Sequence, residues 1–329
     1  EEEAGMFLHL TMIRDSAESI AERAGRDPQE VEGLLARMAK KGLVFTSKKG
    51  DSLRYAAVPY VVGIFEHQLK TMDRELAELT EQYFQEAFGR NLSAGVTPLR
   101  TIPVNQAIEH QWPVTPYEDV RRIVESQERI SVADCMCRVH QGLLGKACDK
   151  PLEVCFAFGA QAQYYVDSGL GRWIDKEEAL RIIDTCDEAG LVPQPFNAQQ
   201  ASGMCNCCGD CCDILRSIKM HPKPADRVVA NYYARVDPEA CTACETCLTR
   251  CQMDAIAVES DDAARVNRDR CIGCGLCVTT CPSGARNLEA KPPVERREPP
   301  ARGLDTIMAM ARAREDAMSS GAGKKRPQG

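Results

Sequence analysis

The sequence of 329 residues contains no run of 18 apolar residues, so it predicts no transmembrane helix. It also has neither a G-x-x-x-x-G-K-[ST] loop nor a G-x-G-x-x-G fingerprint, which leaves no recognisable nucleotide or flavin site. Positive charge is not in excess: the formal net charge is -7, which argues against general affinity for nucleic acid or acidic membrane surfaces. No apolar or arginine-rich leader opens the sequence.

Cysteine, by contrast, is abundant, with 18 residues in a chain long enough for two to three domains. Cysteines spaced for metal binding belong in a reducing compartment, so we expect a cytoplasmic protein without a disulfide framework. The five histidines are scattered, and His140 alone follows closely on cysteines. No catalytic constellation stands out, so the sequence argues against a stand-alone enzyme.

One cysteine pattern, C-x2-C-x2-C-x3-C, is written twice, thirty positions apart. The first copy comprises Cys241, Cys244, Cys247 and Cys251, and the second comprises Cys271, Cys274, Cys277 and Cys281. Three thiolates at this spacing can hold one cube of iron and sulfide, while the fourth points toward a neighbouring cube. Zinc is the alternative, but it prefers two separate C-x2-C pairs.

The segment resembles a bacterial two-cluster ferredoxin, and the resemblance implies crossed ligands. It assigns one 4Fe-4S cluster to Cys241, Cys244, Cys247 and Cys281, and the other to Cys251, Cys271, Cys274 and Cys277. Short strands over 255–258 and 285–288 are expected to lead out of the two cluster loops.

The residues between the cysteines differ in the two repeats. Gly273 and Gly275 let backbone amides approach a cluster in the second repeat. The first repeat has Ala243 and Glu245 instead, and the carboxylate predicts a lower reduction potential at the first cluster. Gln252 follows the first repeat where the family pattern has proline.

A second group of cysteines lies in the central region. Nine of its ten members lie in two clumps: Cys135, Cys137, Cys148, Cys155, Cys205, Cys207, Cys208, Cys211 and Cys212. Neighbouring thiols along a chain point different ways and cannot all be core, so the pattern favours one or two further 4Fe-4S clusters. A structural zinc site and reactive dithiols remain as alternatives.

Other central residues have weaker signals. Cys186 falls on the apolar face of a helix that begins at Asp175, which predicts a buried structural thiol. Arg138 and Lys146 are candidates for positive charge near cluster sulfides, with a solvated surface position as the alternative.

Residues 4–60 have the pattern of a winged helix. Ser16 predicts the start of one helix, and Asp27, followed by proline, predicts the start of the next. Strands over 43–46 and 53–58 complete the wing. The domain resembles the helix-turn-helix domains of bacterial transcription regulators.

The charges of this region argue against a DNA reader. Through residue 90, twelve Lys and Arg stand against sixteen Asp and Glu. Glu30 and Glu32 lie near the start of the helix that would enter the major groove, where base contacts are made. We therefore expect protein docking or dimerisation, and nucleic-acid binding is disfavoured.

The full prediction is an α+β multidomain chain. Its parts are a winged helix (1–60), a long amphipathic helix (61–95), a Cys-rich central domain (96–224), a two-cluster ferredoxin domain (225–291), and a linker, short helix and mobile tail (292–329). The amphipathic helix needs a partner, either within the chain or in a homodimer.

This layout resembles predicted 4Fe-4S proteins of strictly anaerobic bacteria. The resemblance implies an electron carrier that relays low-potential electrons between redox partner proteins in a larger oxidoreductase complex. Two alternatives stay open at this point: a redox-sensing transcription regulator, and a small-molecule reductase acting at a non-standard central cluster.

Overall fold

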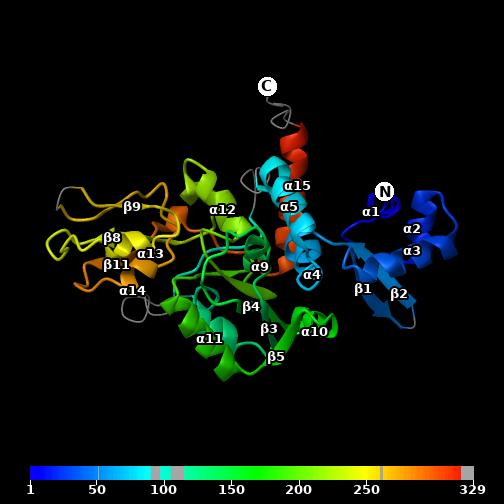
Figure 1. The fold of residues 1–329 in the computed structure, drawn as a ribbon, viewed down its shortest axis with the longest axis horizontal. Coiled ribbons are helices and arrows are strands. Elements are labelled where there is room, and N and C mark those ends of the chain that lie inside the picture. Colours follow the sequence, from blue (N-terminus) through cyan, green and yellow to red (C-terminus); the bar gives the residue numbers. More distant parts are fainter. Residues whose placement is uncertain (51, 90–96, 105–114, 260–261, 320–329) are drawn as a thin grey trace. The chain divides into compact units, whose positions relative to one another are not determined.

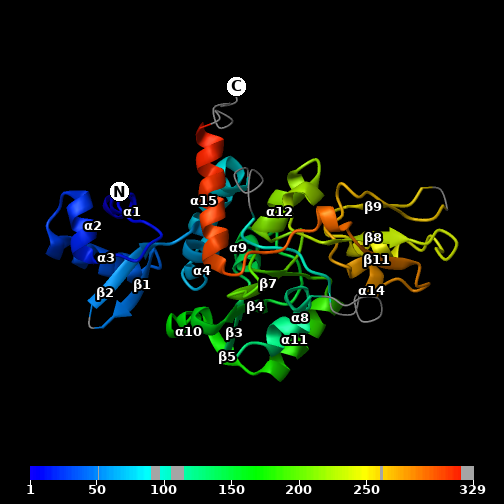
Figure 2. The same cartoon turned by 180° about the vertical axis from the view of Figure 1, so that it is seen from behind.

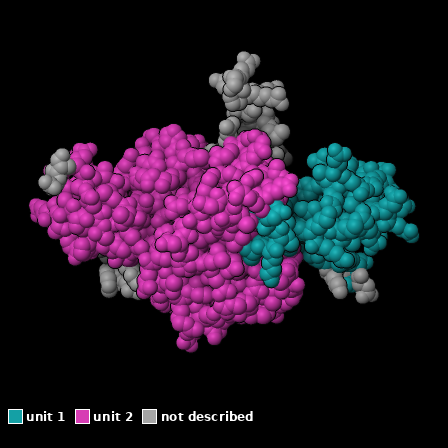
Figure 3. Space-filling model, viewed as in Figure 1, with its two compact units in different colours: residues 1–73 teal, residues 74–329 magenta. Residues whose placement is uncertain are grey.

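The chain is a mixed helix-and-sheet protein with two compact units, shown separately coloured in Figure 3. Unit 1 is Glu1–Asp73 and unit 2 is Arg74–Gly329. The computed structural model describes residues 1–50, 52–89, 97–104, 115–259 and 262–319. Within these residues no helix has both the length and the apolar character that crossing a membrane requires.

Unit 1 consists of helices followed by a β-hairpin. Its elements are α1 (Glu2–Phe7), α2 (Ala17–Ala24), α3 (Pro28–Lys40), β1 (Val44–Lys49) and β2 (Ser52–Ala57). The two strands pair antiparallel, with Val44 opposite Ala57. The buried stripe of α3, which includes Val31 and Leu35, packs with Ile20 of α2 in one core.

Both expected helix starts are present in unit 1. Ser16 Oγ accepts a hydrogen bond from Ser19 N (3.3 Å) at the start of α2. The Asp27 carboxylate accepts hydrogen bonds from Gln29 N (2.9 Å) and Glu30 N (3.1 Å) at the start of α3. These bonds satisfy amides that have no partner inside the helix.

The single helix predicted over 61–95 is interrupted. The described residues form three shorter pieces: α4 (Phe65–His67), α5 (Arg74–Tyr83) and a π-helical turn (Phe84–Phe88). The side-chain amide of Gln68 donates to Lys41 O (3.1 Å) and Ile64 O (3.3 Å), which fixes the end of α4 against the end of α3. Residues 90–95 of the prediction lie outside the described residues.

Helix α5 belongs to unit 2 and is held there by polar contacts. Arg216 Nη1 and Nη2 donate to the Glu81 carboxylate (3.0 and 2.5 Å), and Gln141 Nε2 donates to it as well (3.0 Å). Burial alone would raise the pKa of Glu81, but these hydrogen bonds outweigh it and lower the pKa to about 2. The Arg216 guanidinium also lies 4.4 Å from the centre of the Phe84 ring.

The centre of unit 2 is an antiparallel sheet in the order β5-β3-β4-β7-β6 (Figure 1). The strands are β3 (Ile130–Asp134), β4 (Glu153–Phe158), β5 (Gly171–Ile174), β6 (Val192–Pro195) and β7 (Gly203–Cys207). The helices are α8 (Val120–Glu125), α9 (Met136–Leu143), α10 (Gly159–Asp167), α11 (Lys176–Glu188) and α12 (Asp213–Met220). Side chains of α8, α11, β3 and β4 form one buried core.

The last part of unit 2 holds two small antiparallel sheets and a closing helix (Figures 1 and 2). Its elements are β8 (Tyr232–Val236), α13 (Thr246–Arg250), β9 (Ile256–Ala257), β10 (Arg265–Val266), α14 (Leu276–Thr279), β11 (Arg286–Ala290) and α15 (Gly303–Ser319). Strand β8 pairs with β11, and β9 pairs with β10. Thr306 Oγ1 donates to Asn197 O, which fixes the start of α15 to the loop between β6 and β7. Residues 320–329, predicted as a tail, lie outside the described residues.

Candidate functional site

The eight cysteines of the repeated pattern gather around two hollows. The outer hollow is lined by Cys241, Cys244, Cys247 and Cys281. The inner hollow is lined by Cys251, Cys271, Cys274 and Cys277. Each hollow thus combines three cysteines of one repeat with the last cysteine of the other, as expected for crossed ligands.

Backbone amides point at the cysteine sulfurs of both hollows. In the outer hollow, Ala264 N donates to Cys241 Sγ (3.4 Å). In the inner hollow, Ala255 N donates to Cys251 Sγ (3.2 Å) and Ala234 N donates to Cys271 Sγ (3.4 Å). Such bonds stabilise thiolate sulfur and tune iron–sulfur clusters, so the residues present fit the cofactor that the sequence implies.

The two repeats share one backbone conformation despite their different sequences. Positive φ angles recur thirty positions apart, at Ala243 (50°) and Gly273 (67°), and at Glu245 (60°) and Gly275 (79°). Only the second repeat has glycine at these positions, so the first holds L-residues in the left-handed region, at a cost of about 1–2 kcal/mol each. At Gly273 a Cβ atom would also lie 2.2 Å from Tyr232 O, which excludes any side chain.

The hollows differ in their exposure to solvent. Cys244 of the outer hollow is exposed, and its hydrogen bond with Thr246 lowers the pKa of the thiol. Burial raises the pKa of Cys277 in the inner hollow to about 12, and raises that of Cys274 as well. The cysteines of the outer hollow are therefore the more exposed ones, since Cys244 is exposed and none of the four in the inner hollow is.

A buried arginine adjoins the outer hollow. Arg286, which is 3% exposed, donates from Nη2 to Cys247 Sγ (2.8 Å). Glu245, the basis for predicting a lower potential here, is exposed. Two unit charges about 4 Å apart interact by about 1 kcal/mol in water, but by about 4 kcal/mol at an effective dielectric constant of 20. The buried cation opposes the effect of the exposed carboxylate and favours the reduced state of this site. The lower potential inferred from Glu245 stays a prediction.

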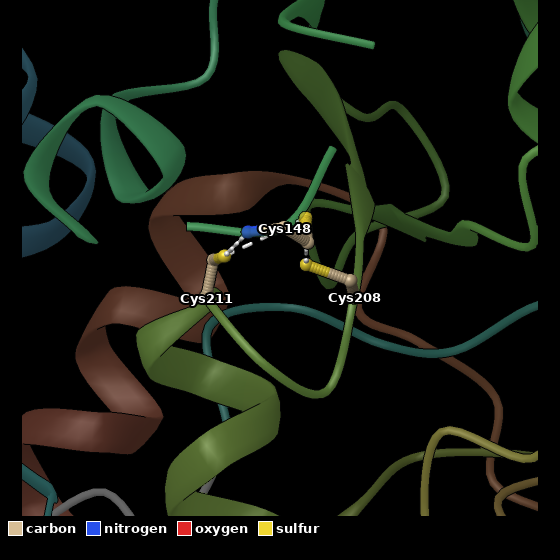
Figure 4. A group of neighbouring side chains, drawn as sticks. All are labelled: Cys148, Cys208 and Cys211. Atoms are coloured by element: carbon tan, nitrogen blue, oxygen red, sulfur yellow. Dashed lines mark hydrogen bonds between the residues drawn. The ribbon is translucent and has the colours of Figure 1, made fainter. Parts of the chain in front are cut away.

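The nine central cysteines divide into two groups that sequence spacing did not separate. The three-thiol group comprises Cys148, Cys208 and Cys211, whose sulfurs lie within 4.8 Å of one another (Figure 4). Cys148 Sγ lies 3.6 Å from both other sulfurs, and its backbone N donates to Cys211 Sγ (3.4 Å). A loop between α9 and β4 carries Cys148, while the other two lie between β7 and α12.

The other six central cysteines, the six-thiol group, form a closed ring. Each thiol shifts the pKa of two others, in the cyclic order Cys135, Cys137, Cys212, Cys207, Cys205 and Cys155. Pairing of Phe156 with Met204 brings β4 and β7 together, and with them three members of the ring. Two others are N-caps, of α9 and α12, where the helix dipole favours a thiolate.

The pKa values alternate around this ring. Interaction with the neighbouring thiols lowers the pKa of Cys205 to about 5, and also lowers those of Cys135 and Cys212. The same interactions raise the pKa values of the intervening thiols. A bound metal would deprotonate the thiols that it binds.

Arg138 lies between the two central groups and is buried, with 3% of its surface exposed. Burial alone would lower its pKa, but attraction to Cys135 and Cys208 and a hydrogen bond with Cys148 raise it. The surface alternative for Arg138 is therefore wrong, whereas Lys146 is exposed. His140 does not face the thiols: its Nε2 lies 2.9 Å from Ala77 O of α5.

Cys186 belongs to neither central group, but it packs in one core with Cys135, Cys208 and Cys211. It is 2% exposed on α11, whose first turn is capped by Asp175 through a bond from Glu178 N (2.7 Å). Burial raises the pKa of the Cys186 thiol to about 12. The expectation of a buried structural thiol is confirmed.

Comparison with known families adds one finding. A family model described as a 4Fe-4S dicluster domain matches residues 234–287. This segment is similar to a dicluster domain, and it is called the dicluster domain from here on. The match contains all eight cysteines of the two hollows and leaves the rest of the chain outside it. No curated protein and no solved structure matches the chain.

The dicluster domain is attached to the central sheet region beside its inner hollow. Gly209 N, within the three-thiol loop, donates to Gln252 Oε1 (2.6 Å), and Gln252 Nε2 donates to Gly190 O (3.0 Å). Arg250 donates to the carbonyls of Glu188 (2.8 Å) and Asp187 (2.6 Å) at the end of α11. Gln252 departs from the proline of the family pattern. Its side chain joins the dicluster domain to the central sheet region.

Proposed function

We propose that this protein is an iron–sulfur electron carrier that relays electrons between a donor and an acceptor protein of anaerobic metabolism. The observation that carries the proposal is the pair of four-cysteine hollows within a segment that matches a 4Fe-4S dicluster domain. The outer hollow would be formed by Cys241, Cys244, Cys247 and Cys281 as ligands of one cluster. The inner hollow would use Cys251, Cys271, Cys274 and Cys277 for the other.

Each bound cluster supplies reversible one-electron chemistry, and the chain's own residues set its direction. Exposure of Cys244 makes the outer hollow the place where a partner protein can approach closely. The inner hollow continues into the central region through Gln252, whose neighbour Cys251 lines it. We infer that electrons enter at the outer hollow and pass inward, or make the same journey in reverse.

The six-thiol group extends this relay as a further iron–sulfur centre. No three of its sulfurs lie within 4.8 Å of one another among the described residues, and the same holds for each dicluster hollow. Wide separation suits a polynuclear cluster, because each thiolate then binds a different iron atom. Arg138 at the edge of the ring offsets the negative charge that a thiolate-bound cluster adds.

Unit 1 serves the relay as a protein-docking module with a winged-helix arrangement. Glu30 and Glu32 are exposed near the start of α3, where a DNA reader needs contact with bases. The basic residues at its other end are partly neutralised: Arg37 lies 3.8 Å from Glu2, and Lys41 lies 2.8 Å from Glu3. This charge pattern favours a protein partner over a phosphate backbone.

The experiment is a reductive titration of anaerobically purified full-length protein, followed by low-temperature electron spin resonance. We expect two one-electron centres from the dicluster domain, and reoxidation by a one-electron acceptor such as a c-type cytochrome. Cys244→Ala should remove one of these signals. The matched control, Cys186→Ala, removes a buried thiol that lines neither dicluster hollow and should retain both. If Cys244→Ala retains both signals, the ligand assignment is contradicted. If the wild-type protein shows no reversible reduction, the proposed function is contradicted.

A further inference from the structure

The three-thiol group differs from every other cysteine site in this chain. Its three sulfurs are mutually close, whereas no other three Cys, His, Asp or Glu ligand atoms of the described residues lie within 4.8 Å of one another. The dicluster hollows give an internal reference for the spacing of cluster ligands; this comparison rests on their proposed function. By that reference the three-thiol group is too compact for a cube of iron and sulfide.

The spacing fits a single metal ion. A tetrahedral zinc ion binds thiolates at about 2.3 Å, which places two of its sulfur ligands about 3.8 Å apart. The separations of 3.6 Å from Cys148 to Cys208 and from Cys148 to Cys211 agree with that geometry (Figure 4). Cys208 and Cys211 also form a C-x2-C step, which is common in zinc sites.

The surroundings stabilise thiolates at this position. Cys148 N donates to Cys211 Sγ (3.4 Å), so one backbone amide already points at a ligand sulfur. The Arg138 guanidinium donates to Pro151 O (2.9 Å) and Asn206 O (3.1 Å) beside the group. Its Nε is buried without a hydrogen-bond partner among the described residues. Three thiolates and a divalent ion carry one net negative charge, which this cation balances.

We propose that Cys148, Cys208 and Cys211 hold one thiophilic ion of the zinc class, separate from the iron–sulfur centres. The described part of the chain supplies no fourth Cys, His, Asp or Glu to the group. A fourth coordination position is therefore left for water or a small ligand from solution. Three protein ligands with one open position are typical of zinc sites that bind or activate a ligand, whereas structural sites are closed by four.

The loop that carries Cys208 and Cys211 is held in place by a hydrogen bond to the dicluster domain. Gly209, between Cys208 and Cys211, donates its N–H to Gln252 Oε1 (2.6 Å). A Cβ atom at Gly209 would lie 2.4 Å from Gln252 O, so only glycine permits this approach. This close contact between Gly209 and Gln252 fixes the ion's position beside the inner hollow. The ion itself is redox-inert if it is zinc.

The test measures zinc and iron per chain in anaerobically purified full-length protein, together with zinc K-edge absorption. We expect about one zinc per chain, with three sulfur neighbours at about 2.3 Å and one oxygen or nitrogen neighbour. Cys148→Ala should lose the zinc and keep its iron and both dicluster spin-resonance signals. Cys186→Ala, the control, should keep zinc and iron alike.

The results that would overturn the single-ion site differ from those that would refute the proposed function. Wild-type protein without zinc, or loss of iron instead of zinc in Cys148→Ala, would overturn the single-ion site while leaving the dicluster relay intact. Four sulfur neighbours would overturn the open position. Absence of the dicluster signals from wild-type protein would instead refute the proposed function, whatever its zinc content.

Discussion

Replacing Arg286 by glutamine tests how this chain sets the potential of its outer cluster. The side chain is 3% exposed and donates to Cys247 Sγ at 2.8 Å. A hydrogen bond that involves a charged group contributes about 1.5–3 kcal/mol. Because about 1.4 kcal/mol corresponds to 59 mV for one electron, Arg286→Gln should lower the potential of one cluster by roughly 60–130 mV.

The assay is a potentiometric titration monitored by spin resonance, in which only one of the two dicluster waves should move. Arg235→Gln is the matched control, since it removes the same charge from strand β8, which pairs with the strand of Arg286. Arg235 is 72% exposed and lies 3.5 Å from Glu289, so solvent screens its charge and its loss should shift neither wave appreciably. Arg286→Lys should move the wave less than Arg286→Gln. Equal shifts in the glutamine variants, or no shift in Arg286→Gln, would refute the reasoning.

Three further predictions concern cluster binding and stability. Gly273→Ala should abolish binding of the inner cluster, because a Cβ would lie 2.2 Å from Tyr232 O. The measured result should be loss of about half of the dicluster iron. Retained iron would contradict the close approach of Gly273 to Tyr232 O. Ala243→Gly, at the equivalent position of the first repeat (φ 50°), should stabilise the protein by about 1 kcal/mol, measured as a higher thermal midpoint; a lower midpoint would show that no strain is relieved. Glu81→Gln should destabilise the protein by up to about 3 kcal/mol at pH 7, because the pKa of Glu81 is lowered to about 2. Since a depressed carboxyl pKa stabilises above the unfolded value of about 4.5, the difference from wild type should shrink as the pH falls from 4.5 toward 2, and a constant difference would contradict it.

Local signals in the sequence were sufficient for parts of this fold. The helix starts at Ser16 and Asp27 were predictable because capping depends on neighbours within three residues. The dicluster segment was predictable because cluster ligands recur at fixed short spacings. The interruption near Gln68 was not, because the apolar spacing is helical on both sides and the bond to Lys41 O that ends α4 comes from distant sequence.

The division of the central cysteines was beyond sequence reasoning for the same reason. Cys148 meets Cys208 across sixty positions, and only the pairing of β4 with β7 and the course of the intervening loops bring such residues together. Arg286 meets Cys247 across 39 positions, so a count of nearby charges selected the exposed Glu245 instead. Gln252 gave one usable signal, its departure from the proline of the family pattern.

Iron and acid-labile sulfide per chain, measured on anaerobically purified full-length protein, test the central claim most directly. Two 4Fe-4S clusters require about eight irons and eight sulfides from the dicluster domain alone, and the six-thiol group should add to both. At least eight of each, with reversible one-electron reduction, is the result that the account predicts. Fewer than eight irons in well-preserved protein, or iron without sulfide, would contradict it.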